Sequence, residues 1–332
     1  MAEFVSSFIT GFQSVIEKDL SLRLKGIKIL NLFDGLVHYR FDGDSRELEK
    51  IIYFNNTFFV LKTIKKEHIS FPQLVNEVIS SRNYFLVNKG SFRIRFQNEN
   101  QFTGVDKNLT RKAEEYVLRN SKLKLDRLSP SNEIWFSIRR EGFAFSGELI
   151  THREFTEKNL NKGELRPEIA FLIACFAGLK GEEVIAEPFS GYGSIPVQIA
   201  KRFKFSKLYV SDIDEEKTAL LKEKKALQNE AIDVRDCDAM KLSHIEDKSV
   251  DVIVTDPPWG FYEDIGDVFV FYKRMFESFK RILKTGGKMI VLSARKEEIE
   301  KALDEMNIQI IESLHTLVNG KKTVLYKLSF SS

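Results

Sequence analysis

The chain has 332 residues, of which 43% are hydrophobic and 30% charged, and its formal net charge is +3 at pH 7. This composition predicts a globular protein of two or three domains and excludes a largely disordered chain. No apolar run is long enough to span a bilayer, and residues 1–30 lack a basic start followed by an apolar stretch. We therefore expect neither a membrane anchor nor a secretory signal.

The first part of the chain has the element order of a ferredoxin-like fold. Hydrophobic patterning and turn residues predict a strand, a helix, two strands, a helix and a strand. Their ranges are 3–9, 11–24, 28–33, 36–41, 46–53 and 57–64. This β-α-β-β-α-β order predicts a ferredoxin-like domain at residues 1–66.

A second α+β unit is expected over residues 67–150. Its elements are a helix, a strand, a helix and two strands, with the ranges 71–80, 91–96, 109–120, 133–139 and 142–150. In the first of these strands Arg93 and Arg95 alternate with apolar residues. The two arginines should therefore share one face of the strand while the apolar side chains fill the core.

Positive charge is concentrated in this front part. Residues 1–150 hold 23 Lys and Arg against 18 Asp and Glu, whereas the rest of the chain has a net charge of −2. The asymmetry predicts a phosphate-binding region joined to a near-neutral domain, although an ordinary solvated surface accounts for it about as well. Residues 151–164 are polar and predict a linker between the two.

Residues 165–332 predict a doubly wound α/β domain whose first turn suits ligand binding. A short apolar strand at 184–186 runs into a turn with Gly191 and Gly193, and a helix follows. Glycines let a ligand approach the backbone, and the helix N-terminus offers free N–H donors. The third glycine of the dinucleotide fingerprint is missing. The next strand ends in Asp212, about 20 residues on, where an acid binds ribose hydroxyls in such sites.

Four predicted strand ends carry an acid: Glu187, Asp212, Asp238 and Asp256. Helical stretches at 195–203, 215–228 and 268–283 alternate with these strands. In a doubly wound sheet such strand ends line one crevice. Asp238, after the third strand, can accept a hydrogen bond from an adenine amine.

The segment Asp256-Pro257-Pro258-Trp259 after the fourth strand indicates a pocket for a planar amine. Asp256 and the carbonyls around the prolines can accept both N–H bonds of an exocyclic amino group, and the indole of Trp259 can stack on the ring that bears it. The prolines lack an N–H, so few donors of the loop compete for these carbonyls. A plain Pro-Pro turn is the alternative, and the acids upstream favour the pocket.

A strand, a charged helix and two more strands close the chain, at 288–292, 296–306, 308–318 and 323–328. The last two strands meet at Asn319-Gly320, a dipeptide that favours a tight hairpin turn. An antiparallel hairpin at the end of an otherwise parallel sheet separates this layout from an ordinary nicotinamide-binding fold.

Together these features resemble the class I methyltransferases that use S-adenosylmethionine, over about residues 165–329. The resemblance implies that Glu187 and the turn at 191–193 face the methionine end of the cofactor, Asp212 its ribose and Asp238 its adenine. It implies that Asp256, Pro257, Pro258 and Trp259 hold the target amine. Further cofactor contacts are implied at Arg166, Pro167, Phe189, Ile213 and Ala239.

The stretch at 164–170, which opens a helix, and the Asp-Pro-Pro-Trp-Gly motif resemble the guanosine N2 methyltransferases that carry a THUMP domain. Members of that family usually have Asp-Pro-Phe-Cys-Gly-Ser-Gly after the first strand and a Glu one turn into the next helix. This chain departs from the pattern at Glu187, Ser190, Tyr192 and Gln198.

Residues 1–150 resemble the ferredoxin-like and THUMP region of RNA-modifying enzymes, mainly in the order of their elements. The resemblance implies that this region grips the acceptor end of a tRNA. The phosphate contacts we expect are Arg93, Arg95, Lys107, Arg111 and Lys112, each of which ordinary surface pairing explains about as well. His152 and Arg153 in the linker are further candidates for RNA contact.

The leading hypothesis is S-adenosylmethionine-dependent methylation of the N2 amine of a guanosine in RNA, with tRNA as the partner we expect. The alternatives are a ribosomal RNA guanosine N2 methyltransferase, a nucleic-acid adenine N6 methyltransferase and a non-catalytic RNA-binding protein. The two cysteines, Cys175 and Cys237, lie 62 positions apart and the five histidines are scattered, which predicts no disulfide framework and no metal site. We expect a cytoplasmic protein, and the oligomeric state stays open.

Overall fold

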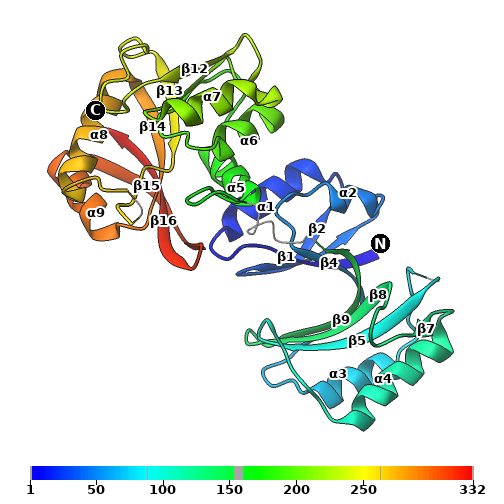
Figure 1. Cartoon of the computed structure of the whole chain (residues 1–332). Helices are drawn as coiled ribbons and strands as arrows, with labels where there is room; N and C mark the ends of the chain where they lie inside the picture. The colour runs from blue at the N-terminus through cyan, green and yellow to red at the C-terminus, as the bar shows by residue number, and fades with distance from the viewer. Residues whose placement is uncertain (1, 88, 153–159, 262, 331–332) are drawn as a thin grey trace. The chain divides into compact units, whose positions relative to one another are not determined.

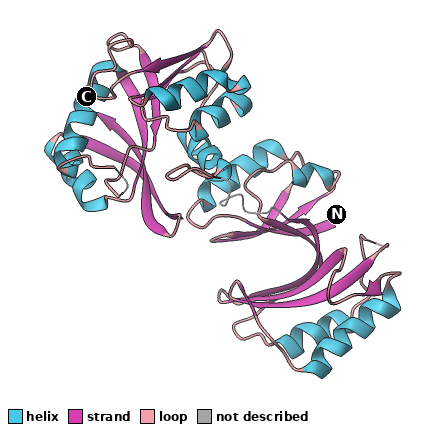
Figure 2. Ribbon diagram, in the orientation of Figure 1, coloured by secondary structure: helices cyan, strands magenta, loops and turns pink. Residues whose placement is uncertain are grey.

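The protein is described here by a computed structural model, which covers residues 2–87, 89–152, 160–261 and 263–330. The chain divides into two compact units, one of residues 1–8 and 16–154 and the other of residues 9–15 and 155–332. The division after residue 154 falls within the expected linker at 151–164. Among the described helices, none is long and apolar enough to cross a membrane. Figures 1 and 2 show the elements of each unit.

The ferredoxin-like order expected for residues 1–66 is confirmed. Its elements are β1 (Ala2–Ser7), α1 (Gln13–Arg23), β2 (Lys28–Phe33), β3 (Leu36–Phe41), α2 (Arg46–Glu49) and β4 (Asn56–Lys65). Helix α2 is half as long as the expected 46–53. The reason is that the chain turns inward after Lys50, which buries Ile51 and Tyr53 and lets the Tyr53 hydroxyl donate a 2.8 Å hydrogen bond to Asp19.

The second half of this unit consists of α3 (Phe71–Ile79), β5 (Ser91–Asn98), β6 (Gln101–Phe102), α4 (Lys107–Asn120), β7 (Lys124–Leu125), β8 (Asn132–Arg139) and β9 (Phe143–His152). One sheet runs through both halves in the order β2-β3-β1-β4-β9-β8-β5-β6, with β7 also paired to β5. The halves join because β4 and β9 pair antiparallel over nearly their full length. Residue 66, the expected domain boundary, therefore lies at a strand end inside one continuous sheet.

Helices α3 and α4 lie side by side on one face of the sheet (Figure 1). Helix α3 begins at a capping box in which the Ser70 hydroxyl accepts from the backbone of Gln73 and the Gln73 side chain accepts from that of Ser70. Apolar side chains of α3, α4 and β5 fill the core between them, among them Leu74, Phe92 and Val117. The alternation expected for β5 is confirmed, since Phe92 and Phe96 are buried on the core face.

The second unit is the doubly wound domain that the sequence predicts, and its fold class is confirmed. Its elements are α5 (Pro167–Ala177), β10 (Val184–Glu187), α6 (Ser194–Arg202), β11 (Lys207–Asp212), α7 (Glu215–Glu223), a 3-10 turn (Lys225–Leu227), β12 (Ile232–Asp236), β13 (Val250–Thr255), α8 (Val268–Ile282), β14 (Leu283–Ser293), α9 (Lys296–Glu305), β15 (Ile308–Val318) and β16 (Lys321–Phe330). The sheet order is β12-β11-β10-β13-β14-β16-β15.

Strands β10 to β14 pair in parallel, and β16 pairs antiparallel with both β14 and β15, as expected for a terminal hairpin. Helix α7 is shorter than the expected 215–228. It ends where Lys224 adopts an extended conformation, and the following 3-10 turn buries Leu227. Strand β14 begins at Leu283 rather than at 288.

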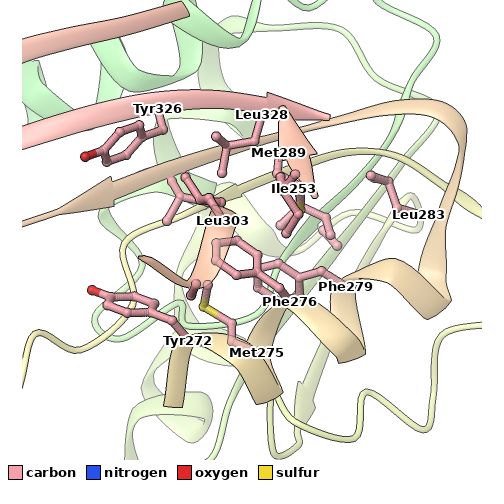
Figure 3. Packing of buried hydrophobic residues seen from close by; sticks show 14 of the residues in the cluster. Ile253, Tyr272, Met275, Phe276, Phe279, Leu283, Met289, Leu303, Tyr326 and Leu328 are labelled. Carbon is pink, nitrogen blue, oxygen red and sulfur yellow. The ribbon is translucent and has the colours of Figure 1, made fainter. Parts of the chain in front are cut away.

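A large apolar core fixes the central strands of this unit (Figure 3). Helix α8 contributes Met275, Phe276 and Phe279, which pack with Ile253 of β13 and Met289 of β14. All five side chains are fully buried, and burying one such side chain is worth about 1.5–3 kcal/mol. The ends of β10 and β13 are therefore held on a rigid base.

Candidate active site

The predicted acids lie at the carboxyl ends of neighbouring parallel strands. Strand β10 lies between β11 and β13, and its last residue, Glu187, is paired with Val210 of β11. Asp212 ends β11, and Asp256 follows the last residue of β13. A hydrogen bond of 2.9 Å from Cys237 N–H to the Asp212 carbonyl brings the loop that carries Asp238 to the same edge.

The turn after β10 is built around its glycines. Gly191 and Gly193 have φ angles of +51° and +85°. Residues other than glycine rarely adopt such positive φ angles. A Cβ atom on Gly193 would lie 2.4 Å from Leu221, whereas one on Gly191 would meet nothing within 4 Å. Gly193 therefore serves packing against α7, and Gly191 faces open space. Helix α6 begins without a side-chain cap, which leaves its first N–H groups for a ligand.

Asp212 holds this turn from the neighbouring strand. Its side chain is almost buried, and its two oxygens accept hydrogen bonds from Gly191 N–H (2.7 Å) and Asp214 N–H (3.0 Å). Each carboxylate oxygen has a second lone pair, so both can also accept from a ribose hydroxyl. The next residue, Ile213, is 72% exposed. An exposed isoleucine beside a ribose site suits packing against the face of an adenine.

Asp238 and its neighbour lie in the loop after β12. Asp238 Oδ1 accepts from Met240 N–H at 2.9 Å, and Oδ2 lies 3.9 Å from the Lys241 ammonium; the side chain is 31% exposed, so it can be reached by an adenine amine. Ala239 is buried. An adenine contact by Asp238 or Ala239 stays a prediction.

Three other expected cofactor residues have structural partners. Pro167 opens α5, and Arg166 just before it forms a 3.4 Å ion pair with Glu168. Phe189 packs against Phe271 of α8, with ring centres 5.8 Å apart. A cofactor contact by Arg166, Pro167 or Phe189 stays a prediction.

Glu187, which is buried, and Asp256, which is half-buried, form an acidic pair at the centre of the strand ends. The hydroxyl of Thr255 donates to Glu187 Oε1 at 2.7 Å. Glu187 Oε2 and Asp256 Oδ1 are buried and have no hydrogen-bond partner among the described residues. Unpaired buried acceptors are rare, because each one costs about 1–3 kcal/mol. The site therefore fits a ligand that brings positive charge and N–H donors, as the amino group and sulfonium of S-adenosylmethionine would.

The same burial shifts the pKa of both carboxyl groups. Burial raises the pKa of Glu187 to about 8, against the hydrogen bond from Thr255 and with the added effect of the Asp212 charge. Burial and the neighbouring Glu187 raise the pKa of Asp256 well above its ordinary value, against the lowering effect of the Trp259 indole. Without a ligand, the pair therefore retains at least one proton near neutral pH.

This retained proton predicts a pH-dependent stability. Since the folded pKa of Glu187 is raised, the folded state holds a proton that the unfolded state releases above pH 4.5, and the stabilisation is lost as the pH rises to about 8. The melting temperature of the cofactor-free wild type, relative to that of Glu187→Gln, should therefore fall between pH 5 and 8. Glu297→Gln, on the exposed side of α9, is the control. If the melting temperatures of the wild type and of Glu187→Gln changed with pH in the same way, the raised pKa of Glu187 would be contradicted.

The loop after Asp256 is held by a residue that the sequence reading did not single out. Arg295 Nε donates to the carbonyl of Trp259 at 2.7 Å, and its guanidinium lies 4.2 Å from the centre of the Phe261 ring. The indole nitrogen of Trp259 is buried without a hydrogen-bond partner among the described residues. Arg295 follows β14, whose residue Val291 pairs with Thr255. This register, which cannot be read from a local motif, places Arg295 beside the loop.

Arg295→Ala is expected to slow turnover by about tenfold to a hundredfold, since a hydrogen bond to a charged group is worth about 1.5–3 kcal/mol. Because Arg295 acts through the Trp259 backbone, kcat should fall while cofactor affinity and melting temperature stay near the wild-type values. Arg295→Lys should restore part of the rate. Lys296→Ala, at the next and exposed position, is the matched control. A variant that instead loses stability and cofactor affinity together would assign Arg295 a purely structural role.

The RNA contacts expected in the first unit are mostly paired within the protein. Arg93 Nε donates to Glu133 at 2.6 Å, and Arg95 lies 3.5 Å from the same carboxylate and over the Phe102 ring. Arg111 pairs with Glu115 at 2.9 Å. Lys107 and Lys112 are exposed on α4.

Of the two linker candidates, His152 forms a 2.7 Å hydrogen bond with Asn56, and Arg153 lies outside the described residues. RNA binding by any of these residues stays a prediction. The described residues contain no group of three or more His, Cys, Asp or Glu side chains that could hold a metal ion.

Known proteins resemble this chain in sequence and in fold. A tRNA (guanine(6)-N2)-methyltransferase of Methanocaldococcus jannaschii is 23% identical over 92% of this chain and 94% of its own length. A U6 snRNA (guanine-N(2))-methyltransferase, THUMPD2 of Bos taurus, is 29% identical over 39% of this chain and 25% of its own length. The crystal structure of TrmN from Thermus thermophilus has the same fold, with a TM-score of 0.76, 19% identity and 100% of both chains covered.

Residues 153–323 match the family described as RMKL-like, methyltransferase domain. The match spans β10 to β15 and with them the glycine turn, the four acids and the Asp-Pro-Pro-Trp loop. The chain therefore belongs to the RMKL-like methyltransferase domain family and is an enzyme that uses S-adenosylmethionine as its methyl donor.

Proposed function

We propose that the enzyme methylates the exocyclic N2 amine of a guanosine in tRNA. The observation that carries the proposal is the buried Oδ1 of Asp256, an acceptor without a partner in the described structure, beside Trp259 and one strand away from Glu187. The named activity of the Methanocaldococcus jannaschii relative, which aligns along nearly the whole chain, supports guanosine N2 and tRNA as the target.

The residues of the loop account for the chemistry of an aromatic amine. The lone pair of guanosine N2 is delocalised into the ring, so hydrogen bonds from its N–H groups to Asp256 and to a proline carbonyl draw the nitrogen towards tetrahedral geometry. The base stacks on Trp259 after it leaves the RNA helix. When bound, S-adenosylmethionine would supply an electrophilic methyl group.

Asp256 also accounts for the proton balance. Transfer of the methyl group to N2 leaves one N–H proton in excess, and an ionised Asp256 within hydrogen-bond reach accepts it. The raised pKa of Asp256 makes it a stronger base than an exposed aspartate. The positive charge of the bound cofactor favours the ionised carboxylates that this step needs.

An adenine N6 amine presents the same two N–H donors, so the loop alone does not select guanosine. Three substrates offered in parallel test the class of nucleic acid. The enzyme is incubated with methyl-labelled S-adenosylmethionine and unmodified tRNA, ribosomal RNA or duplex DNA. We expect label in tRNA. Label in ribosomal RNA or DNA with none in tRNA would contradict the proposal.

A further inference from the structure

The first unit contains a basic hollow that none of the expected RNA contacts lines. It has a volume of about 500 Å³ and is lined by Lys89, Gly90, Ser91, Lys122, Lys124 and Ser131. It lies where three strands begin, since Ser91 opens β5, Lys124 opens β7, and Ser131 precedes β8. Both β7 and β8 pair with β5 in parallel, so the N-terminal ends of these three strands lie on the same side of the sheet.

Backbone and hydroxyl hydrogen bonds fix the floor of the hollow. Ser131 Oγ donates to the Ser91 carbonyl at 3.0 Å and accepts from Ser91 N–H at 2.8 Å. Ser91 Oγ accepts from Ser131 N–H at 3.1 Å, which leaves its own hydrogen for a ligand. Lys124 N–H donates to the Gly90 carbonyl. Gly90 has a φ of +100°, and a Cβ atom on it would lie 2.3 Å from Ser131 Oγ.

The net charge of the hollow differs from that of the arginine cluster, which consists of Arg93 and Arg95 with Glu133. Lys89, Lys122 and Lys124 are exposed, no carboxylate lines the hollow, and none of the three forms an ion pair in the described part of the unit. By contrast, Arg93 and Arg95 share the carboxylate of Glu133. The arginine cluster thus has one net positive charge, whereas the hollow has three. A phosphate gains more where no carboxylate has to be displaced.

We infer that this hollow is a binding site for the phosphates of the RNA backbone. Lysine ammonium groups on flexible stems bind phosphate as point charges, and the hydroxyl of Ser91 adds a neutral donor. The inference rests on the proposed function, because the RNA it binds is the tRNA substrate. An open hollow with charges on several chain segments suits successive phosphates of a strand.

The test compares two triple variants of the full chain in tRNA binding at several salt concentrations. Lys89→Ala/Lys122→Ala/Lys124→Ala empties the hollow of charge. Lys18→Ala/Lys25→Ala/Lys50→Ala removes the same charge from exposed positions elsewhere in the unit. Each phosphate contact contributes about 0.7–0.9 to the slope of log affinity against log salt. The first variant should therefore lose about 2–3 from the slope and on the order of tenfold or more in affinity at low salt.

The control triple variant should bind tRNA nearly as the wild type does. Cofactor affinity and melting temperature should stay unchanged in both variants, and a single Lys122→Glu reversal should weaken binding in the same direction. A hollow variant with the wild-type affinity and slope would overturn the inference, and so would a loss confined to Arg93→Ala/Arg95→Ala. A wild type that does not methylate tRNA would instead overturn the proposed function, so the two failures can be told apart.

Discussion

Asp256→Ala should lower the rate of methyl transfer by a factor on the order of 10² to 10³, the loss seen when one preorganised partner of a reacting group is removed. Asp256 offers a carboxylate next to the prolines and Trp259, both to orient the amine and to take its proton. Cofactor affinity should change little, because the ribose and adenine contacts that we expect lie on other strands. Single-turnover methylation and calorimetric cofactor binding on the same preparation measure the two effects.

The stability of this variant separates a catalytic from a structural role. Asp256 Oδ1 is buried without a partner among the described residues, and its charge opposes that of Glu187. Removing the carboxyl group should therefore leave the melting temperature unchanged or raise it. Asp256→Asn keeps the shape but cannot accept the proton and should also be slow. Glu263→Ala, an exposed carboxylate a few residues on in the same loop, is the control and should be fully active.

If Asp256→Ala instead lowered the melting temperature and lost cofactor binding and activity together, the role of Asp256 would be to stabilise the turn after β13. The effect of Trp259→Ala should be less confined to the rate of methyl transfer, because base stacking contributes about 1–3 kcal/mol to binding and tolerates any base. Trp259→Ala should raise KM for RNA more than Asp256→Ala does.

Asp212→Ala should weaken S-adenosylmethionine binding by roughly tenfold or more. Charge-assisted hydrogen bonds from the two ribose hydroxyls are worth about 1.5–3 kcal/mol each. The structure adds a second reason, because Asp212 also accepts from Gly191 N–H and so ties the glycine turn to β11. Both effects act on the cofactor site, and calorimetry reports their sum.

Two further variants sharpen this test. Asp212→Asn keeps one oxygen for the backbone and should lose less affinity than Asp212→Ala. Asp236→Asn changes the carboxylate that ends the neighbouring strand β12, which is half exposed and contacts Thr218. It should bind the cofactor as the wild type does. Unchanged binding by Asp212→Ala would remove Asp212 from the site.

Local sequence patterns were sufficient to predict that the four acids lie at or just after strand ends. Glu187 and Asp212 end their strands, Asp256 directly follows β13, and Asp238 lies two residues beyond β12. The strand ends of a doubly wound sheet meet on one side of it. Helix ends were harder to predict, because α2 and α7 stop where buried residues such as Tyr53 and Leu227 pull the chain inward. That pull depends on tertiary packing, which propensity does not contain.

Contacts between distant residues could not be predicted from pattern. Arg93 was expected to face RNA, and its alternation in β5 is as predicted, but Glu133 of β8 pairs with it across the sheet. Arg295 reaches the Trp259 carbonyl only because β14 lies beside β13. The lysine hollow likewise arises where three strands start together. In each case strand register, which one sequence does not specify, brings the residues into contact.

The identity of the methylated nucleoside tests the central claim most directly. Unmodified tRNA is incubated with the wild-type enzyme and methyl-labelled S-adenosylmethionine, digested to nucleosides and separated by chromatography with mass detection. The account predicts that the label is in N2-methylguanosine and that Asp256→Ala gives almost none. Label in N6-methyladenosine, or an Asp256→Ala enzyme that binds the cofactor and still forms N2-methylguanosine at the wild-type rate, would contradict it.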